Sequence, residues 1–436
     1  MKYILIFLFV FLSVISLANE ETWGLVLSGG GAKGAYEIGV WKALLDLDFE
    51  LGGVYGTSVG AINSAAVAQG DLTKAVNLWK NLKDSDVMVM TPEVKKLLDQ
   101  SGIKVLTDII KLPFKEIEDL GKTIVEQGII NTDPLKKTLD AALSEEKIRN
   151  SSVNMGLVTF DVTELKPKML YVDEIPQGQL IDFVIASGNF PLFVREKING
   201  QKYMDGGVYY NMPIKMAVNK GFKKVIAVQI GGERIGLVIN ALQMFKLDEY
   251  IYIAPRVIYG SVLDFNPENS LKMLIEGYLD TLHVNKYVSG DYTYIMEDKN
   301  IIKSMYDSLS DSEKSEALKM AGPLQFYRTF DHMEKSLLEK YSMDDPVNLW
   351  NFIFDDIACS LSVNPLELYN GEKIVNEISK ISKTEQKYNE GNTINGMTLR
   401  DIVSFFNYLS EKSSFEENET EKYQKFSAGI DFFKNN

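Results

Sequence analysis

Two glycine-rich turns near the start of the chain contain residue types that could carry out acyl transfer. The first runs from Ser28 to Gly34 (SGGGAKG), and the second runs from Gly56 to Gly60 (GTSVG). Acyl transfer needs a nucleophile, donors for the oxyanion that its attack creates, and a base. The two turns can provide the first two parts, and Asp205 is the candidate for the third.

The second turn has the pattern Gly-x-Ser-x-Gly between a predicted strand and a predicted helix, which is typical of a nucleophile elbow. Gly56 and Gly60 leave room where a Cβ atom would collide with neighbouring elements. The turn exposes Oγ of Ser58 and places the N–H of Val59 beside it. The five-residue pattern alone is weak, because Gly and Ser are common turn residues. Its position at a strand-to-helix junction predicts Ser58 as a nucleophile.

The first turn allows two functional interpretations. The N–H groups of Gly29, Gly30 and Gly31, at the start of a predicted helix, could hold an oxyanion. With Gly34, the same glycines fit the dinucleotide pattern G-x-G-x-x-G. A Walker A loop is excluded, because Lys33 precedes Gly34 and no Ser or Thr follows that glycine. The structural alternative is a tight packing turn.

The acidic residue of a dinucleotide site should end the second strand, about 20 residues after the glycines. Asp48 and Glu50 have the right spacing, but they precede that predicted strand. Ser58 follows its end instead. This placement favours an oxyanion site over a dinucleotide site.

Asp205 is the favoured base for Ser58, because it lies in a loop constrained by Gly206 and Gly207. The chain contains two histidines. The order Ser58, Asp205, His283 formally suits a Ser-Asp-His triad. However, His283 follows Leu282 within a helical run and His332 lies among charges, so neither occupies a glycine-bounded loop after a strand. A Ser58–Asp205 dyad is therefore preferred, and the triad stays as the alternative.

The elements around the two turns predict a βαβα unit. Apolar runs at Trp23 to Leu27 and Leu51 to Tyr55 have the length of buried strands. Ala35 to Leu47 and Ala61 to Ala68 follow them with helical spacing. This order implies a parallel sheet covered by helices.

Further along the chain, a strand pair is predicted at Val153 to Phe160 and Lys168 to Val172, and the last clear buried strand at Val225 to Ile230. Asp71 to Gln127 reads as mostly helical. From Ser270 the pattern is helical almost to the end.

A domain boundary is expected near Tyr287 to Asp298, where the helical periodicity breaks. Residues 299–436 contain no motif, and we expect a packed helical region of unknown role. A lid, an interaction domain and structural filler all remain open.

Lys2, an apolar run from Tyr3 to Leu17, and small residues ending at Ala18 have the layout of a secretory signal peptide. We therefore expect residues 1–18 to be a signal, and the protein to be secreted or periplasmic. The alternative is an uncleaved anchor, although the run is shorter than the roughly 20 residues of a spanning helix.

Composition excludes several other classes of function. The formal net charge of −14, from 46 basic and 60 acidic residues, argues against nucleic-acid binding and against docking driven by anionic lipids. Apolar contact with a lipid surface stays open. The single cysteine, Cys359, permits no intramolecular disulfide and no cysteine-based metal site. It lies in an apolar run, which predicts a buried structural thiol. No cofactor or metal is expected.

The motifs GGGAKG, GTSVG and DGG, in this order, resemble the patatin-like phospholipases, in particular bacterial secreted ones. The segments GAYEIGVWKALL, ASGNFPLFV, DGGVYYNMPI and YIAPRVIYGSVLDF also look like that family. The resemblance covers about Trp23 to Asp280. Ser28 stands where many relatives have aspartate, and Lys33 where they often have arginine.

The resemblance implies a three-layer α/β/α sandwich with a mostly parallel sheet, at residues 19–298, followed by the helical C-terminal region. It implies that Ser58 attacks a lipid ester and that Asp205 accepts the proton, while Gly29, Gly30 and Gly31 hold the oxyanion. The supporting residues would be Lys33, Gly34, Gly56, Val59, Gly60, Gly206 and Gly207. The substrate would be a phospholipid or lysophospholipid. A non-catalytic nucleotide, anion or lipid binder that uses the Gly29 to Gly34 loop is the alternative class.

Overall fold

The computed structural model describes residues 21–89, 130–194, 196–231, 237–296, 299–320, 329–384, 393–394, 397–415 and 420–436. The chain forms two compact units. The first comprises Met1–Val284 together with Gly429–Asn436, and the second comprises Asn285–Ala428. The boundary expected after residue 298 falls inside the second unit. The predicted signal at residues 1–18 and the predicted helical stretch at 90–127 lie outside the described residues.

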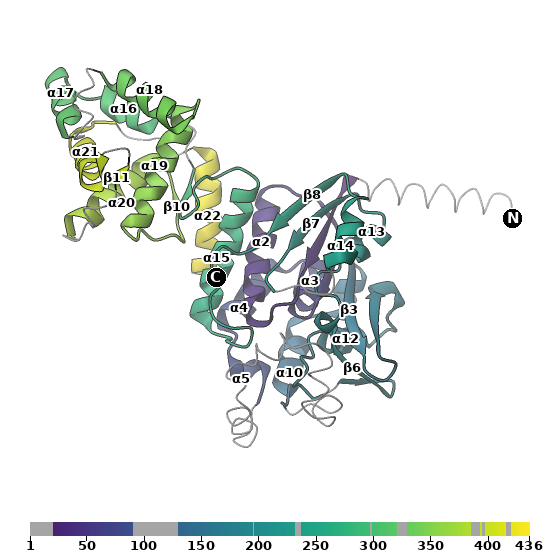
Figure 1. The fold of residues 1–436 in the computed structure, drawn as a ribbon. Helices are drawn as coiled ribbons and strands as arrows, with labels where there is room; N and C mark the ends of the chain where they lie inside the picture. The colour runs from purple at the N-terminus through teal and green to yellow at the C-terminus, as the bar shows by residue number, and fades with distance from the viewer. Residues whose placement is uncertain are drawn as a thin grey trace. The chain divides into compact units, whose positions relative to one another are not determined.

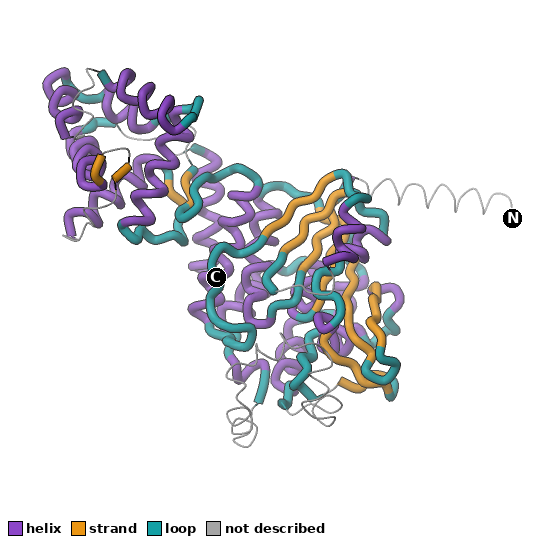
Figure 2. Tube along the Cα trace, in the orientation of Figure 1, coloured by secondary structure: helices purple, strands orange, loops and turns teal. Residues whose placement is uncertain are grey.

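The first unit is built on one mixed sheet, with strand order β5-β6-β3-β2-β1-β7-β8 and β4 paired to β3 (Figure 2). The central strands β3, β2, β1, β7 and β8 are parallel, whereas β4, β5 and β6 pair antiparallel. The strand bounds are β1 Trp23–Leu27, β2 Leu51–Thr57, β3 Asn154–Asp161, β4 Lys166–Tyr171, β5 Glu196–Ile198, β6 Gln201–Asp205, β7 Lys224–Val228 and β8 Glu249–Ile253.

Helices cover both faces of this sheet, which gives the three layers expected from the sequence (Figure 1). Helices α13 and α14 lie on one face, and α2, α3 and α15 lie on the other. The helical bounds are η1 Gly31–Gly34, α2 Ala35–Asp46, α3 Val59–Gln69, α4 Leu72–Asn81, α5 Asp84–Val87, α10 Asp133–Ala142, α11 Glu145–Arg149, η2 Val172–Glu174, α12 Leu180–Ser187, η3 Gly206–Val208, α13 Ile214–Asn219, α14 Leu237–Met244 and α15 Pro267–Val284.

Burial explains why the central strands were predictable. Residues Gly24 to Leu27 of β1 are all buried, as expected for a parallel strand covered on both faces. The turns after β1 and β2 both lie at the carboxyl edge of the sheet, because the two strands are parallel neighbours. In open α/β sheets this edge is where ligands bind.

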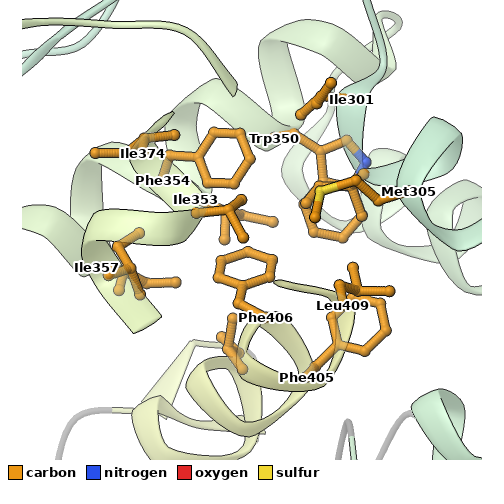
Figure 3. Close-up of a cluster of buried hydrophobic side chains, with 14 of the residues drawn as sticks. Ile301, Met305, Trp350, Ile353, Phe354, Ile357, Ile374, Phe405, Phe406 and Leu409 are labelled. Carbon is orange, nitrogen blue, oxygen red and sulfur yellow. The ribbon is translucent and has the colours of Figure 1, made fainter. Parts of the chain in front are cut away.

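The second unit is helical. Its helices are α16 Ile301–Asp307, α17 Asp311–Met320, α18 Phe330–Tyr341, α19 Pro346–Ser360, α20 Gly371–Thr384 and α21 Leu399–Lys412. Four two-residue strands accompany them: β9 Tyr294–Ile295, β10 Leu368–Tyr369, β11 Thr393–Ile394 and β12 Met397–Thr398. Its core joins aromatic and aliphatic side chains of α19 and α21, among them Trp350, Phe354 and Phe406 (Figure 3).

Cys359 is exposed, so the prediction of a buried thiol is wrong. Helix α19 buries Ile353, Phe354, Ile357 and Ala358. Cys359 lies on the opposite face with the exposed residues Phe352 and Asp356, because side chains three or seven positions apart in a helix share a face. An apolar run in the sequence therefore did not mean burial of every residue.

The last helix, α22 (Glu421–Asn435), contributes residues to both units. The second unit is thus an insertion between Val284 and Gly429 of the first unit rather than an appended tail. Among the described residues, no helix is both long enough and apolar enough to cross a membrane.

Candidate active site

Ser58 occupies the sharp turn between β2 and α3. Its backbone has φ 58° and ψ −127°, a region that non-glycine residues rarely adopt. The N–H of Ser58 donates to Oγ of Ser187 (2.9 Å), and that hydroxyl donates to the carbonyl of Val158 (2.6 Å). Ser187 therefore connects the strained turn to the neighbouring strand β3, and it was not among the predicted site residues.

Gly56 and Gly60 allow the turn to form because no side chain fits at either position. A Cβ on Gly56 would lie 2.1 Å from the carbonyl oxygen of Gly60, and one on Gly60 would lie 2.4 Å from that of Leu27. Both clashes are with backbone, which cannot rotate away. The two glycines let α3 start directly against the end of β1.

The Gly60→Ala variant is expected to destabilise the protein by about 3 kcal/mol, at the upper end of ordinary overpacking costs. Gly188→Ala is the matched control, because a Cβ there would lie at least 3.5 Å from its nearest neighbours. Urea denaturation of both variants checks the difference. An equal effect of the two substitutions would contradict the packing argument.

Asp205 lies at the end of β6 and meets the serine. Oγ of Ser58 donates to Oδ2 of Asp205 at 2.6 Å. Oδ1 of the same carboxylate accepts from the N–H of Gly207 (2.7 Å), and the N–H of Asp205 donates to the carbonyl of Asn189 (2.7 Å). A Cβ on Gly206 would lie 2.4 Å from the carbonyl oxygen of Val158, so the loop packs directly on β3. The structure thus brings the two predicted residues into hydrogen-bond contact.

The surroundings of Asp205 make it a stronger base than an ordinary aspartate. Asp205 is 7% exposed, and burial raises its pKa to about 6, although hydrogen bonds from Ser58 and Gly207 act in the opposite direction. A carboxylate with a pKa nearer to the working pH accepts a serine proton more readily. At neutral pH most of the molecules still have Asp205 ionised.

The first glycine turn lies beside Ser58, but not all of its N–H groups are available. The N–H of Gly29 donates to Oδ1 of Asn211 (3.0 Å), and Nδ2 of Asn211 donates back to the carbonyl of Gly29 (3.2 Å). A Cβ on Gly29 would lie 2.9 Å from Cβ of Ser58. Gly29 therefore provides close approach and an anchor, and this differs from its predicted role as an oxyanion donor.

The remaining donors are those of Gly30, Gly31 and Val59. No residue in the described ranges accepts a hydrogen bond from these three N–H groups. Val59 is the first residue of α3, where the helix dipole also favours negative charge. The structure therefore offers a turn and a helix start as candidate oxyanion donors around Ser58.

Asn63 connects the first turn to the serine helix. Its Nδ2 donates to the carbonyl of Gly34 and to Oε2 of Glu37, both at 2.8 Å, and its Oδ1 accepts from Nε1 of Trp79 (3.0 Å). Burial raises the pKa of Glu37 well above its usual range. A Cβ on Gly34 would lie 2.5 Å from Cγ2 of Val59. Asn63 and Gly34 hold the two glycine turns against each other.

Lys33 belongs to the first turn and lines a small cavity with Tyr36, Ile230 and Ile258. Burial lowers the pKa of Lys33. Within the described part of the chain, no carboxylate forms an ion pair with it. Ser28 is fully buried, and its Oγ accepts from the N–H of Ile230 (2.9 Å), which connects the turn to the end of β7.

The structure does not bring a histidine to the Ser58–Asp205 pair. His283 lies in the last turn of α15, and His332 lies in α18 of the second unit. Of the described residues, only Asp205 forms a hydrogen bond with Oγ of Ser58. The same ranges contain no group of three or more His, Cys, Asp or Glu side chains that could hold a metal ion.

Comparison with known proteins finds a family match that covers both glycine turns, Asp205 and strands β2 to β6. Residues 25–218 match the family model described as patatin-like phospholipase. The Aspergillus terreus protein named lysophospholipase nte1 is 37% identical over 212 residues, and the human patatin-like phospholipase domain-containing protein 6 is 26% identical over 217 residues. These matches cover 48% and 49% of this chain but only 12% and 14% of the relatives' own lengths.

Among solved structures, the chain is similar to VipD from Legionella pneumophila, with 18% identity and a TM-score of 0.33 over 95% of this chain and 91% of that chain. The type III effector protein ExoU gives 14% identity and a TM-score of 0.32 over 94% and 77%. TM-scores this low are no basis for transferring properties to this chain.

Proposed function

We propose that the chain, whose residues 25–218 form a patatin-like phospholipase domain, is a serine acylhydrolase that cleaves carboxyl esters of phospholipids or lysophospholipids. The observation that carries this proposal is the 2.6 Å hydrogen bond from Oγ of Ser58, on a strained turn, to the buried carboxylate of Asp205. The family match supports a lipid substrate. One similar protein is named a lysophospholipase, which supports the finer substrate class.

In the proposed reaction, Asp205 accepts the proton of Ser58 while Oγ attacks the ester carbonyl. The N–H groups of Gly30, Gly31 and Val59 stabilise the oxyanion that forms, and the alcohol leaves with the proton held by Asp205. Water then attacks the carbonyl of the acyl-Ser58 ester while Asp205 accepts a proton from it. The bond to Oγ of Ser58 breaks, Asp205 gives this proton to Oγ, and the fatty acid is released. Each oxyanion donor contributes on the order of 10²–10³ in rate.

A fluorophosphonate probe tests this proposal, because it forms a covalent bond with an activated serine. We expect a mass shift on the peptide that contains Ser58 and none in the Ser58→Ala variant. Ser152→Ala is a matched control on an exposed serine and should label normally. A panel of phospholipids, lysophospholipids and triacylglycerols then assigns the substrate class.

A folded protein that resists labelling would contradict the proposal and favour the second candidate, a non-catalytic binder of lipids or anions. The specific observation behind that candidate is that the N–H groups of Gly30 and Gly31, beside Lys33, have no acceptor among the residues that the structure describes. Export through residues 1–18 stays a prediction. N-terminal sequencing of protein recovered from the periplasm or the medium tests it.

A further inference from the structure

The segment at residues 254–266, between β8 and α15, packs against the first glycine turn, which contains the candidate oxyanion donors Gly30 and Gly31. The carbonyl of Val262 accepts from the N–H of Ala32 at 2.8 Å. Gly31 has φ 61°, and a Cβ on it would lie 2.0 Å from the same carbonyl oxygen. We call residues 254–266 the strap. The strap thus contacts the turn at Gly31, which is a candidate donor, and at Ala32, the residue after it.

Two carboxyl groups of α15 fix the strap. Oδ1 of Asp280 pairs with Nε of Arg256 at 2.9 Å, and Oε1 of Glu276 accepts from the N–H of Val257 at 2.7 Å. Asp280 is 2% exposed and Glu276 is 1% exposed. The hydrogen bond between the charged groups of Arg256 and Asp280 is stronger in such a buried place than it would be on a surface. These contacts fix the beginning of the strap to α15. The hydrogen bond between Val262 and Ala32 fixes its later part to the turn.

Helix α15 is in turn fixed to α2, the helix that begins where the turn ends. The hydroxyl of Tyr36 donates to Oδ2 of Asp280 at 2.8 Å. A Cβ on Gly277 would lie 2.1 Å from the carbonyl oxygen of Tyr36, and one on Gly39 would lie 2.0 Å from that of Leu274. The two helices therefore pack backbone against backbone. The turn contacts the strap, the strap contacts α15, and α15 packs on α2, which follows the turn directly in the chain.

We propose that Arg256 and Asp280 are positioning residues, which set the backbone of Gly30 and Gly31 through the strap so that their N–H groups point at the oxyanion. This proposal rests on the proposed acylhydrolase function. Neither residue touches the reacting atoms. Their effect is expected on the chemical step, because a displacement of about 1 Å can cost on the order of 10²-fold in rate.

The charges around the pair suit this role. Burial, and the neighbouring charge of Asp280, raise the pKa of Glu276 to about 8. At neutral pH Glu276 is therefore mostly protonated, and Asp280 is the carboxylate that balances the positive charge of Arg256. Removing Arg256 would leave the carboxylate of Asp280 buried without its cation. An uncompensated buried charge disturbs its surroundings more than the replacement of both partners by apolar residues would.

The test compares Arg256→Gln and Arg256→Lys with the control Arg149→Gln. Arg149 is a similarly half-buried arginine that pairs with Glu145 at 2.7 Å, but it lies in α11 and has no contact with the strap. We expect Arg256→Gln to lower kcat on a soluble ester by about 10- to 100-fold with KM changed by less than about twofold. The lysine variant should recover part of the loss. Arg149→Gln should keep its kcat.

Hydrogen exchange provides a readout that does not depend on activity. The Ala32 N–H that donates to Val262 should exchange faster in Arg256→Gln than in the wild type, and not in Arg149→Gln. If Arg256→Gln does not fold, Tyr36→Phe removes the hydroxyl that donates to Asp280 and should give a smaller shift in the same direction.

Unchanged exchange at Ala32 in both Arg256→Gln and Tyr36→Phe would overturn the positioning role. A loss of kcat in Arg256→Gln that merely follows its loss of folded protein would overturn it as well. A wild type that hydrolyses no ester and resists labelling would instead refute the proposed function. The exchange result would still decide whether the strap holds the turn.

Discussion

Replacement of Asp205 by asparagine is expected to lower kcat for ester hydrolysis by about 10³-fold, within the range that general base catalysis contributes. The amide cannot take the proton that Oγ of Ser58 gives to Oδ2 of Asp205 in the structure. Asparagine has the same shape and can still accept from the N–H of Gly207, so the loop should stay folded. Steady-state kinetics with circular dichroism as the folding check measures both effects.

The pH profile sharpens this test. Because the pKa of Asp205 is raised to about 6, the kcat/KM of the wild type should fall as the pH drops through 6. Acid unfolding through this group would not mimic the effect. Since its folded-state pKa lies above its unfolded value of 3.8, protonation of Asp205 favours the folded state, and its contribution to stability is lost as the pH rises through 6.

The histidine alternative predicts a different outcome. If His283→Ala is inactive while Asp205→Asn keeps near-full activity, the dyad is wrong and the triad stands. We expect the reverse, because His283 forms no hydrogen bond with Ser58 or Asp205. An inflection near pH 6 that persists in the residual activity of Asp205→Asn would also show that another group titrates.

The Ser58–Asp205 pair could be predicted because each residue carries a local signal. Glycines flank Ser58 at a strand-to-helix junction, and two glycines follow Asp205. The partners that hold the pair in place carry no such signal. Ser187 lies 129 residues after Ser58, to which it binds. Asn211 lies 182 residues after Gly29, to which it binds. Nothing in the sequence distinguishes a single serine or asparagine so far along the chain from the other serines and asparagines, so neither contact could be predicted.

The role of Gly29 shows the same limit. Three consecutive glycines predict three equivalent donors, because the sequence shows only that no side chain obstructs them. The structure commits the N–H of Gly29 to Asn211 and leaves those of Gly30 and Gly31 without a described partner. The sequence of the strap resembles the patatin-like phospholipases, but its contact with Ala32 depends on how β8 and α15 are placed and could not be predicted.

For the fold, the continuous apolar runs of the buried strands were a strong signal, and the predicted strands and helices from Trp23 to Ala68 are confirmed within a few residues. Edge elements were missed. Strand β8 exposes Glu249 and Tyr252 at the sheet edge, so it lacks such a run. The short hairpin β5–β6 reads in the sequence as a turn around Asn199. The return of α22 to the first unit had no local signal either.

Replacement of Phe433 by alanine is expected to destabilise the first unit by about 3–5 kcal/mol, the usual cost of removing a buried phenylalanine. Phe433 is 0% exposed and packs edge-on against Tyr278 of α15. A Cβ on Gly429 would lie 2.1 Å from the hydroxyl of Tyr278, which shows how closely the last helix approaches α15. The closing residues of the chain therefore belong to the core of the first unit.

Phe432→Ala is the matched control, because Phe432 is the neighbouring ring and is only partly buried. Of the four tryptophans, only Trp350 lies in the second unit, so in a Trp350→Phe background the fluorescence of urea denaturation reports on the first unit alone. Equal losses from the two phenylalanine variants would contradict the assignment of 429–436. If the assignment holds, deleting 299–436 removes part of the first unit, so the role of the helical unit is better tested by an internal deletion of 285–428.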